Sequence, residues 1–189
     1  PLGPRFASGN TDIFGFTQEL LTVSDTDFDA LSLGGEIGYR ATSRLDIVFD
    51  IYHASSTTYS EFQDWVDLDD RPIQQTTDFS RTSFALSGRY FLADRGVNVS
   101  QFAWVPKSWS PYVGAGAGFM NYNYTQDGDF VDFETLDIFT ARLRSDGTSF
   151  LAQGMAGVQY SFAPNWILTG EARYRWSSAE LQSDYVGFD

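Results

Sequence analysis

The sequence predicts an all-β protein, an antiparallel up-and-down transmembrane β-barrel of about eight strands. Apolar and polar residues alternate with a period of two over long segments, which is the pattern of strands rather than of helices. Many of these segments run past ten residues, longer than the ~5 to 6 residues of an ordinary strand and close to the ~9 to 11 that cross a bilayer at a tilt. Short turns alternate with long acidic connections, which is typical of membrane barrels.

Composition restricts the class of protein before any segment is assigned. The 189 residues fit one domain, expected over 1–189, with 17% aromatic residues, 17 glycines and no cysteine. No apolar run reaches the ~18 to 20 residues that a membrane-spanning helix needs. The formal net charge of -13 argues against nucleic acid as a partner, because phosphates require a basic surface.

The most regular strand patterns lie in three segments, 45–59, 82–92 and 165–178. Each places apolar side chains on one face and mostly polar or charged side chains on the other. In a membrane barrel the apolar face contacts lipid and the other face lines the lumen. The expected lipid-facing residues are Leu45, Ile47, Phe49, Ile51, Phe84, Leu86, Tyr90, Leu92, Trp166, Leu168, Ala172, Tyr174 and Trp176.

Four further strands are predicted at 31–40, 111–124, 148–162 and, with a less regular pattern, 12–23. The total is then seven, whereas single-chain bacterial barrels have even strand numbers because both termini lie on the same side of the membrane. We therefore expect an eighth strand beyond the given sequence. The alternative is that the first ten residues supply it.

Segment 111–124 is unusual because glycine alternates with other residues before a cluster of aromatics. Gly114, Gly116 and Gly118 share one face of the predicted strand with Tyr112 and Met120. The interior of an eight-stranded barrel is only wide enough for side chains, so glycines relieve crowding there. The pattern alone leaves open which face points inward.

Charge and aromatic residues are sorted along the strands. Most of the 25 acidic residues fall in the long connections, at 24–29, 60–78, 125–147 and the C-terminal residues, and we expect these at one end of the barrel. Aromatics near both ends of the strands are expected to form interfacial girdles. A soluble β-sandwich with an aromatic core is the alternative. The expected girdle residues are Tyr39, Tyr90, Trp109, Tyr160, Phe162 and Trp166 at the short turns, and Tyr59, Tyr124, Tyr174 and Trp176 toward the long loops.

Charged residues recur on the predicted inner faces, where four acids meet four bases. Because charges removed from water must pair, these residues predict an ion network in the lumen. The network either closes the narrow barrel permanently, or acts as a gate whose partners exchange to admit a small conductance. The predicted members are Glu36, Arg40, Asp46, Asp50, Arg89, Glu171, Arg173 and Arg175.

No catalytic, metal or cofactor site is predicted. The acidic stretches at 64–70 and 127–137 lack the order of ligands found in a calcium-binding EF-hand loop. His53 is the only histidine, and His53 and Ser55 lie two apart on one strand face. This His-x-Ser pattern resembles that of PagL-type lipid A deacylases, but it falls on an early strand, and the Asn and Gly that follow in that family are missing. An interfacial histidine without a catalytic role is the favoured interpretation.

The segments "LSLGGEIGYRATSRLDIVFDIYH", "SPYVGAGAGFMNYNY" and "FLAQGMAGVQYSFAPNWILTGEARYRW" are together similar to the small outer-membrane β-barrel superfamily of OmpA-, OmpX- and OmpW-like proteins. The resemblance covers most of residues 12–178. It implies an eight-stranded barrel in a bacterial outer membrane, with roles from envelope integrity and adhesion to passage of small solutes.

The function expected from these features is non-enzymatic. A barrel with a plugged polar lumen and long acidic extracellular loops would serve envelope structure or surface interaction. A narrow channel for small or hydrophobic solutes is the alternative, followed by the lipid A deacylase. The expected partners are outer-membrane lipid and lipopolysaccharide, and other envelope or surface proteins through loops 60–78 and 125–147.

Overall fold

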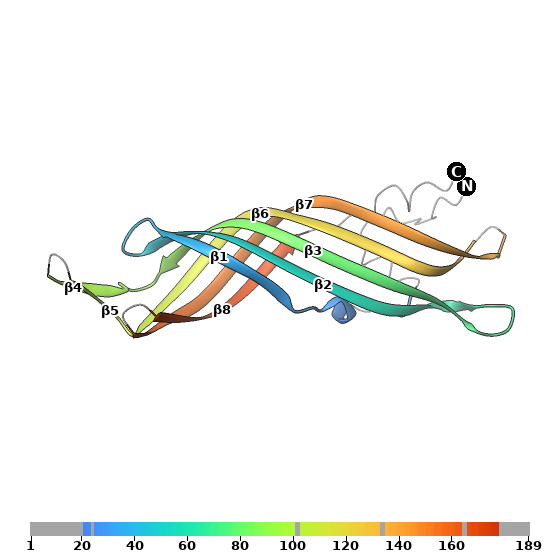
Figure 1. The fold of residues 1–189 in the computed structure, drawn as a ribbon, viewed down its shortest axis with the longest axis horizontal. Helices are drawn as coiled ribbons and strands as arrows, with labels where there is room; N and C mark the ends of the chain where they lie inside the picture. Colours follow the sequence, from blue (N-terminus) through green and yellow to red (C-terminus); the bar gives the residue numbers. More distant parts are fainter. Residues whose placement is uncertain (1–20, 24, 101–102, 133–134, 164–165, 178–189) are drawn as a thin grey trace.

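The computed structural model describes residues 21–23, 25–100, 103–132, 135–163 and 166–177, and almost all of them belong to antiparallel strands (Figure 1). Six strands form one sheet in the order β1-β2-β3-β6-β7-β8, and two short strands form a separate hairpin. The all-β antiparallel prediction is confirmed. The elements are η1 (Asp25–Phe28), β1 (Ser32–Arg40), β2 (Leu45–Val66), β3 (Pro72–Phe91), β4 (Gly96–Ser100), β5 (Ala103–Pro106), β6 (Trp109–Val131), β7 (Ile138–Ala163) and β8 (Trp166–Ser177).

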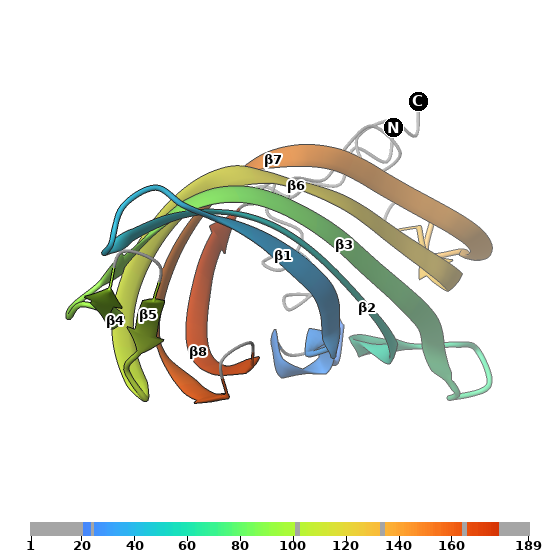
Figure 2. The same ribbon diagram turned by 60° about the vertical axis from the view of Figure 1, so that its left-hand side comes forward.

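The six-stranded sheet curls into a deep trough rather than a closed cylinder. Its two edge strands are β1 and β8, which face each other across the open side of the trough (Figure 2). Of the predicted strand 12–23, residues 12–20 lie outside the described part, and Leu21 forms an isolated bridge with Phe62 on β2. The expected eighth strand also lies outside it. Among the described residues, no helix is long and apolar enough to cross a membrane.

Four strands are much longer than the sequence predicted. β2 and β3 span 22 and 20 residues and are joined by residues 67–71, while β6 and β7 span 23 and 26 residues and are joined through 132–137. The predicted extent of loops 60–78 and 125–147 was therefore wrong, because most of their residues belong to paired strands. The prediction failed because polar residues occur on both faces of these segments, which obscures the alternation although backbone pairing continues.

Alternation along the strands sorts the two faces as predicted. Ile47, Phe49 and Ile51 on β2 are exposed on the outer face, whereas Asp50 is fully buried on the inner face. The same holds on β3 and β8, where Leu86 and Leu168 are exposed. A soluble β-sandwich would require these apolar side chains inside, so the observed faces exclude it.

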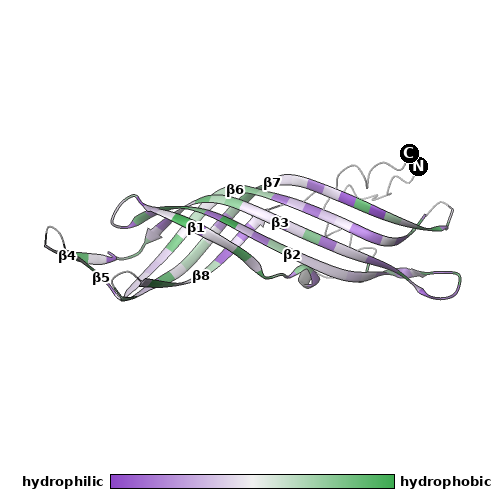
Figure 3. Ribbon diagram, viewed as in Figure 1, coloured by the Kyte–Doolittle hydropathy of each residue, from purple (hydrophilic) through white to green (hydrophobic). Residues whose placement is uncertain are grey.

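The outward apolar side chains form a belt that ends at a sharp boundary. The last apolar row pairs Ile51, Phe84, Phe119 and Phe150 across four strands, and the next outward row pairs His53, Thr82, Asn121 and Thr148. On β6 the belt runs from Trp109 to Phe119, which matches the ~9 to 11 residues of one bilayer crossing. Figure 3 shows the green apolar colour concentrated in this half of the sheet and purple toward the long hairpins. We call these outward apolar residues, from the short turns up to the row of Ile51, Phe84, Phe119 and Phe150, the apolar belt.

The parts of β2, β3, β6 and β7 beyond the apolar belt form a four-stranded extension, over 53–66, 72–82, 121–131 and 138–148. This arrangement corrects two predicted girdle residues. Tyr59 is exposed on the outer face but lies well within the extension, and Tyr124 is fully buried on the inner face. On β3, β6 and β7 the aromatics at the boundary are Phe84, Phe119 and Phe150 instead.

The inner face of the extension carries a buried apolar cluster, interspersed with buried polar side chains such as Gln75, Thr77 and Gln126. Phe79, Met120, Tyr122, Tyr124 and Leu151 belong to one buried cluster. The chain before β1 covers this cluster with Leu21, Val23 and Phe28, and the Phe28 and Phe79 rings meet edge to face at 6.1 Å. Met120, Tyr122 and Tyr124 are buried and lie on the same strand face as the β6 glycines. The glycine face of β6 therefore points inward, which answers the question that the sequence pattern left open.

Candidate functional site in the lumen

A cluster of charged side chains lies on the inner face of the trough at the level of the apolar belt. The side chains come from strands β1, β2, β3 and β8, which the curl of the sheet brings around one hollow side (Figure 2). Three carboxylates meet three guanidinium groups, so the formal charges balance. We call this group the lumen cluster: Glu36 (β1), Asp50 (β2), Arg89 (β3), and Glu171, Arg173 and Arg175 (β8).

Arg89 is at the centre of one half of the lumen cluster. Its Nη2 donates to both carboxylate oxygens of Glu36 and to Oε2 of Glu171, each at 3.0 Å. The hydroxyl of Tyr112 on β6 donates to the same Oε2 at 2.7 Å, and the Arg89 guanidinium lies 4.7 Å from the centre of the Tyr112 ring. Arg89 is 4% exposed, so these partners replace the water that its charge would otherwise hold.

Asp50 is at the centre of the other half. It is fully buried, and its carboxylate contacts Arg173 Nη1 at 3.1 Å and Arg175 Nη2 at 3.4 Å. Gln153 on β7 donates from Nε2 to Asp50 at 2.8 Å and to the Ser87 hydroxyl at 2.7 Å, and accepts at Oε1 from Arg175 Nε at 3.0 Å. Gln153 thus ties β7 to β2, β3 and β8.

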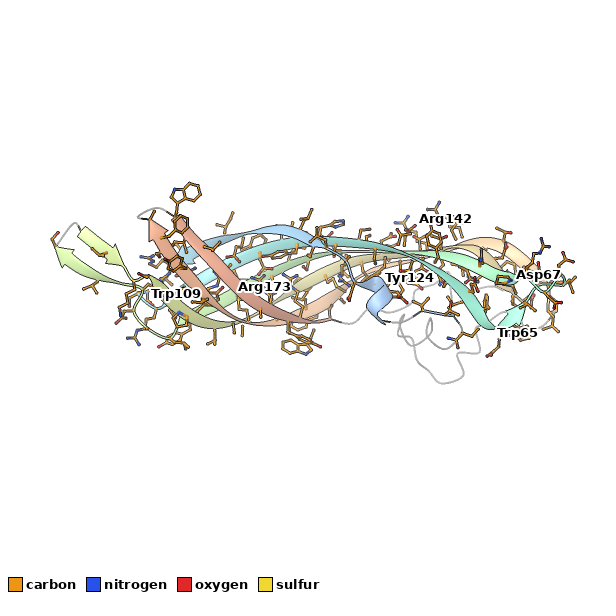
Figure 4. The ribbon with its side chains drawn as sticks, turned by 90° about the horizontal axis from the view of Figure 1, so that it is seen from below. Trp65, Asp67, Trp109, Tyr124, Arg142 and Arg173 are labelled. Atoms are coloured by element: carbon orange, nitrogen blue, oxygen red, sulfur yellow. The ribbon has the colours of Figure 1, made fainter. Side chains whose placement is uncertain are left out.

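Arg173 joins the two halves and bridges the two edges of the sheet. Besides Asp50, its guanidinium contacts Glu171 on its own strand at 2.6 Å and Glu36 on β1 at 3.2 Å. The contact with Glu36 crosses the open side of the trough, from β8 to β1. One guanidinium therefore has three carboxylates within reach, and Figure 4 shows Arg173 in the half of the molecule near the short turns.

Two predicted network residues lie apart from this cluster. Asp46 pairs with Arg95 instead, at 2.8 and 2.9 Å, and the Arg95 guanidinium also donates to the backbone of the turn before β2 and lies 4.1 Å from the centre of the Phe91 ring. Arg40 is exposed at the end of β1, opposite Asp46 in the strand register. This second ion pair is buried near the short turns.

Sequence reasoning missed Arg95 and Tyr112 as partners. Arg95 lies in the connection after β3, where strand alternation gives no direction for a side chain. Tyr112 lies at an even position on β6, the same parity as Gly114 and Gly116, and would have been assigned inward once the glycine face was placed there.

The short turns carry their own charged pair outside the apolar belt. Arg44 donates to Asp94 through Nε at 2.7 Å and Nη2 at 3.1 Å. These hydrogen bonds lower the pKa of the Asp94 carboxyl and raise that of the Arg44 guanidinium. The pair links the β1–β2 turn to the connection that follows β3.

His53 and Ser55 are on the outer face of β2, just beyond the apolar belt. The Nδ1 atom of His53 is 2.9 Å from the Thr82 hydroxyl on β3. A catalytic histidine is normally oriented by a carboxylate at this nitrogen, whereas Thr82 offers a neutral hydroxyl. Among the described residues, no group of three or more His, Asp or Glu side chains is arranged to hold a metal.

A model of the family described as outer membrane protein beta-barrel domain matches residues 2–187. No curated protein matches the chain. No solved structure matches it either.

Proposed function

The chain belongs to the outer membrane protein beta-barrel family, and from this premise we propose that it is a non-enzymatic barrel of a bacterial outer membrane with an ionically closed lumen. The observation that carries the proposal is the lumen cluster. Its six charged side chains balance in sign, and its central members are buried. Desolvated charges in such a network are held firmly, because removing one partner leaves another unpaired.

The extension supports a role in envelope structure or surface interaction. Long connections of outer-membrane barrels lie on the extracellular side, so the extension would project there. From Ile51 to Val66 the β2 strand runs about 50 Å beyond the belt, at ~3.3 Å per residue. Its tip carries Trp65, Leu68 and Asp67, with Leu68 fully exposed (Figure 4). We propose that residues 60–78 and 125–147 contact other envelope or surface proteins, and that the apolar belt contacts lipid and lipopolysaccharide.

Conductance across a planar bilayer tests the closed lumen. We expect the intact protein to be silent, and Arg89→Ala to open a small conductance because Glu36 and Glu171 lose a shared partner. The control is Arg144→Ala, which removes an exposed arginine of the extension. Steady conductance by the unaltered protein would contradict the proposal. Gel mobility before and after boiling verifies in each preparation that the barrel is folded.

One observation favours a gated channel as the second candidate. Arg173 has Glu36, Asp50 and Glu171 all within 3.2 Å, so it can exchange carboxylates without becoming unpaired. A gate would appear as brief openings of the unaltered protein that Arg173→Lys makes more frequent. Lysine keeps the charge but lacks the planar fork that binds several carboxylates at once.

The lipid A deacylase is a weaker alternative. We expect His53→Ala and Ser55→Ala to leave lipid A acylation unchanged in cells that express the protein, as measured by mass spectrometry. Loss of a deacylated species in both variants would instead assign an enzymatic role.

A further inference from the structure

A hollow lies on the outer face of the extension, well beyond the apolar belt. Its volume is about 580 Å³. It is lined by Thr22 beside the edge of β2, Tyr59 and Glu61 on β2, Gln74 and Thr76 on β3, and Asp127 on β6. Ser60 and Gln75 also border the hollow. Their side chains are buried on the inner face, so alternation directs Tyr59, Glu61, Gln74 and Thr76 outward. We call this hollow the outer groove.

The backbone at Gly128 brings two strands close together beneath the outer groove. Gly128 has a φ of 150°, which L side chains rarely adopt, and a side chain there would collide with the backbone of Gln74 and Gln75 on β3. The position therefore requires glycine. Its backbone forms part of the floor of the outer groove.

The side chains of the outer groove combine one free aromatic ring with fixed planar polar groups. Tyr59 is 81% exposed, so its ring face is available for contact. Gln74 Nε2 donates to Glu61 Oε1 at 2.9 Å, and the Glu61 backbone N–H donates to the Thr22 hydroxyl at 3.0 Å. Thr76 and Asp127 lie in the same row of the sheet as Tyr59. The groove thus offers an apolar plane beside hydroxyl, amide and carboxylate groups.

We propose that the outer groove binds an uncharged sugar of the polysaccharide chains of lipopolysaccharide. A pyranose ring has an apolar C–H face, which a tyrosine ring covers, and a rim of hydroxyls, which amides and carboxylates bind. The volume lies within the ~300 to 1,000 Å³ of small-molecule sites, too small for a folded protein partner. The lining includes two carboxylates and no basic residue, and Arg142, which lies 3.8 Å from Asp127, offsets only one of the two charges. The groove therefore favours an uncharged ligand over a phosphate or acidic sugar.

The position of the groove agrees with this ligand. Tyr59 is eight residues past Ile51, about 26 Å along the strand and somewhat less in height because of the strand tilt. The polar headgroup layer adds only ~5 to 7 Å to each side of the hydrocarbon. The groove therefore lies beyond the headgroups, at a level where sugar chains surround an outer-membrane protein. This inference rests on the proposed outer-membrane location with the extension outside.

Saturation-transfer NMR on the protein in lipid nanodiscs tests the proposal. The probes are polysaccharide freed from lipid A by mild acid, and maltoheptaose as a defined neutral sugar. We expect saturation on sugar ring C–H protons, with binding weakened about tenfold in Tyr59→Ala, the size of effect expected when an aromatic contact is lost. Tyr59→Phe keeps the ring and should bind as the unaltered protein does.

The matched control is Trp65→Ala, which removes an aromatic of the same hairpin outside the groove and should leave binding unchanged. Absence of signal from both probes, or equal binding by Tyr59→Ala, overturns the groove assignment. Gel mobility before and after boiling and conductance in a planar bilayer are measured on the same samples. A folded, non-conducting barrel that binds no sugar would contradict the groove assignment alone and leave the proposed function standing.

Discussion

Single charged residues in the lumen depend on partners from distant parts of the chain. Asp50 is fully buried and contacts Arg173, Arg175 and Gln153, which are more than 100 residues away in sequence. Taking these charges out of water is costly, and their mutual attraction offsets that cost only while every partner is present. The lumen cluster is therefore sensitive to the loss of any one member.

Asp50→Ala should destabilise the folded barrel by about 3 to 5 kcal/mol, because it leaves two buried guanidinium groups short of a carboxylate. The measurement is urea unfolding in lipid vesicles followed by tryptophan fluorescence. Asp146→Ala is the control, since Asp146 pairs with Arg144 on the exposed face of the extension and such pairs contribute ~0 to 1 kcal/mol. Equal effects of the two variants would show that the lumen cluster does not hold the barrel together.

The pair of Arg44 and Asp94 predicts a pH effect at the short turns. Hydrogen bonds from Arg44 lower the pKa of Asp94 in the folded state. The pair therefore contributes stability above the ordinary aspartate pKa of ~3.9, and this contribution is lost as the pH falls through the lowered folded-state value. Carboxyl chemical-shift titration should give a pKa below the ordinary value, and Arg44→Ala should move it back up. An unchanged Asp94 pKa in Arg44→Ala would contradict the pairing.

At the scale of elements, β6 shows why one strand needs small residues. It is paired with β3 and β7 over most of its length, and three successive inward positions, Gly114, Gly116 and Gly118, are glycine between the large inward residues Tyr112 and Met120. A Cβ atom at Gly114 would lie 2.7 Å from the backbone oxygen of Gly88 and 2.9 Å from Met155 Cγ. Glycine is therefore required there by the close approach of neighbouring strands.

Gly114→Ala should destabilise the barrel by about 1 to 3 kcal/mol, because the added methyl group overpacks a tight inner face. Gly170→Ala on β8 is the matched control, since a Cβ atom there meets nothing within 4 Å. The check is the temperature at which each variant loses its compact gel mobility. Tolerance of Gly114→Ala equal to that of Gly170→Ala would refute the crowding argument.

At the scale of the whole molecule, the apolar belt fixes how the barrel sits in a bilayer. The apolar belt lies at the short-turn end of the sheet. Trp109 is at the edge of the belt nearest the short turns, and Trp65 is at the far tip of the extension (Figure 4). The separation of these tryptophans follows from strand length, because only about half of β6 lies within the belt.

Variants that retain a single tryptophan test this placement. We expect brominated lipids to quench the fluorescence of a protein that keeps only Trp109 or only Trp176, because both rings are exposed on the belt. A protein that keeps only Trp65 should be unaffected, because its ring lies tens of ångströms beyond the headgroups by strand length. Strong quenching of Trp65 would mean that the extension lies on or in the membrane.

The sequence by itself determined the strand character and the two faces of the strands. These properties follow from local alternation, since a period of two assigns every side chain of a strand to one face or the other. Ile47 and Phe49 are exposed on the outer face, and Asp50 and Arg89 are buried on the inner face, as this alternation predicts.

Only the tertiary structure decided which charges meet, where the long strands end and where the outer groove lies. Alternation gives no information about strand register or sheet curvature. It therefore could not predict that Asp46 pairs with Arg95, or that Arg173 on β8 contacts Glu36 on β1. Alternation is also a weak signal where polar residues occur on both faces, which is why the extension was expected to be loops. Ion pairs, crowding at glycines and surface hollows arise from contacts between strands, and those are fixed only when the whole sheet has curled.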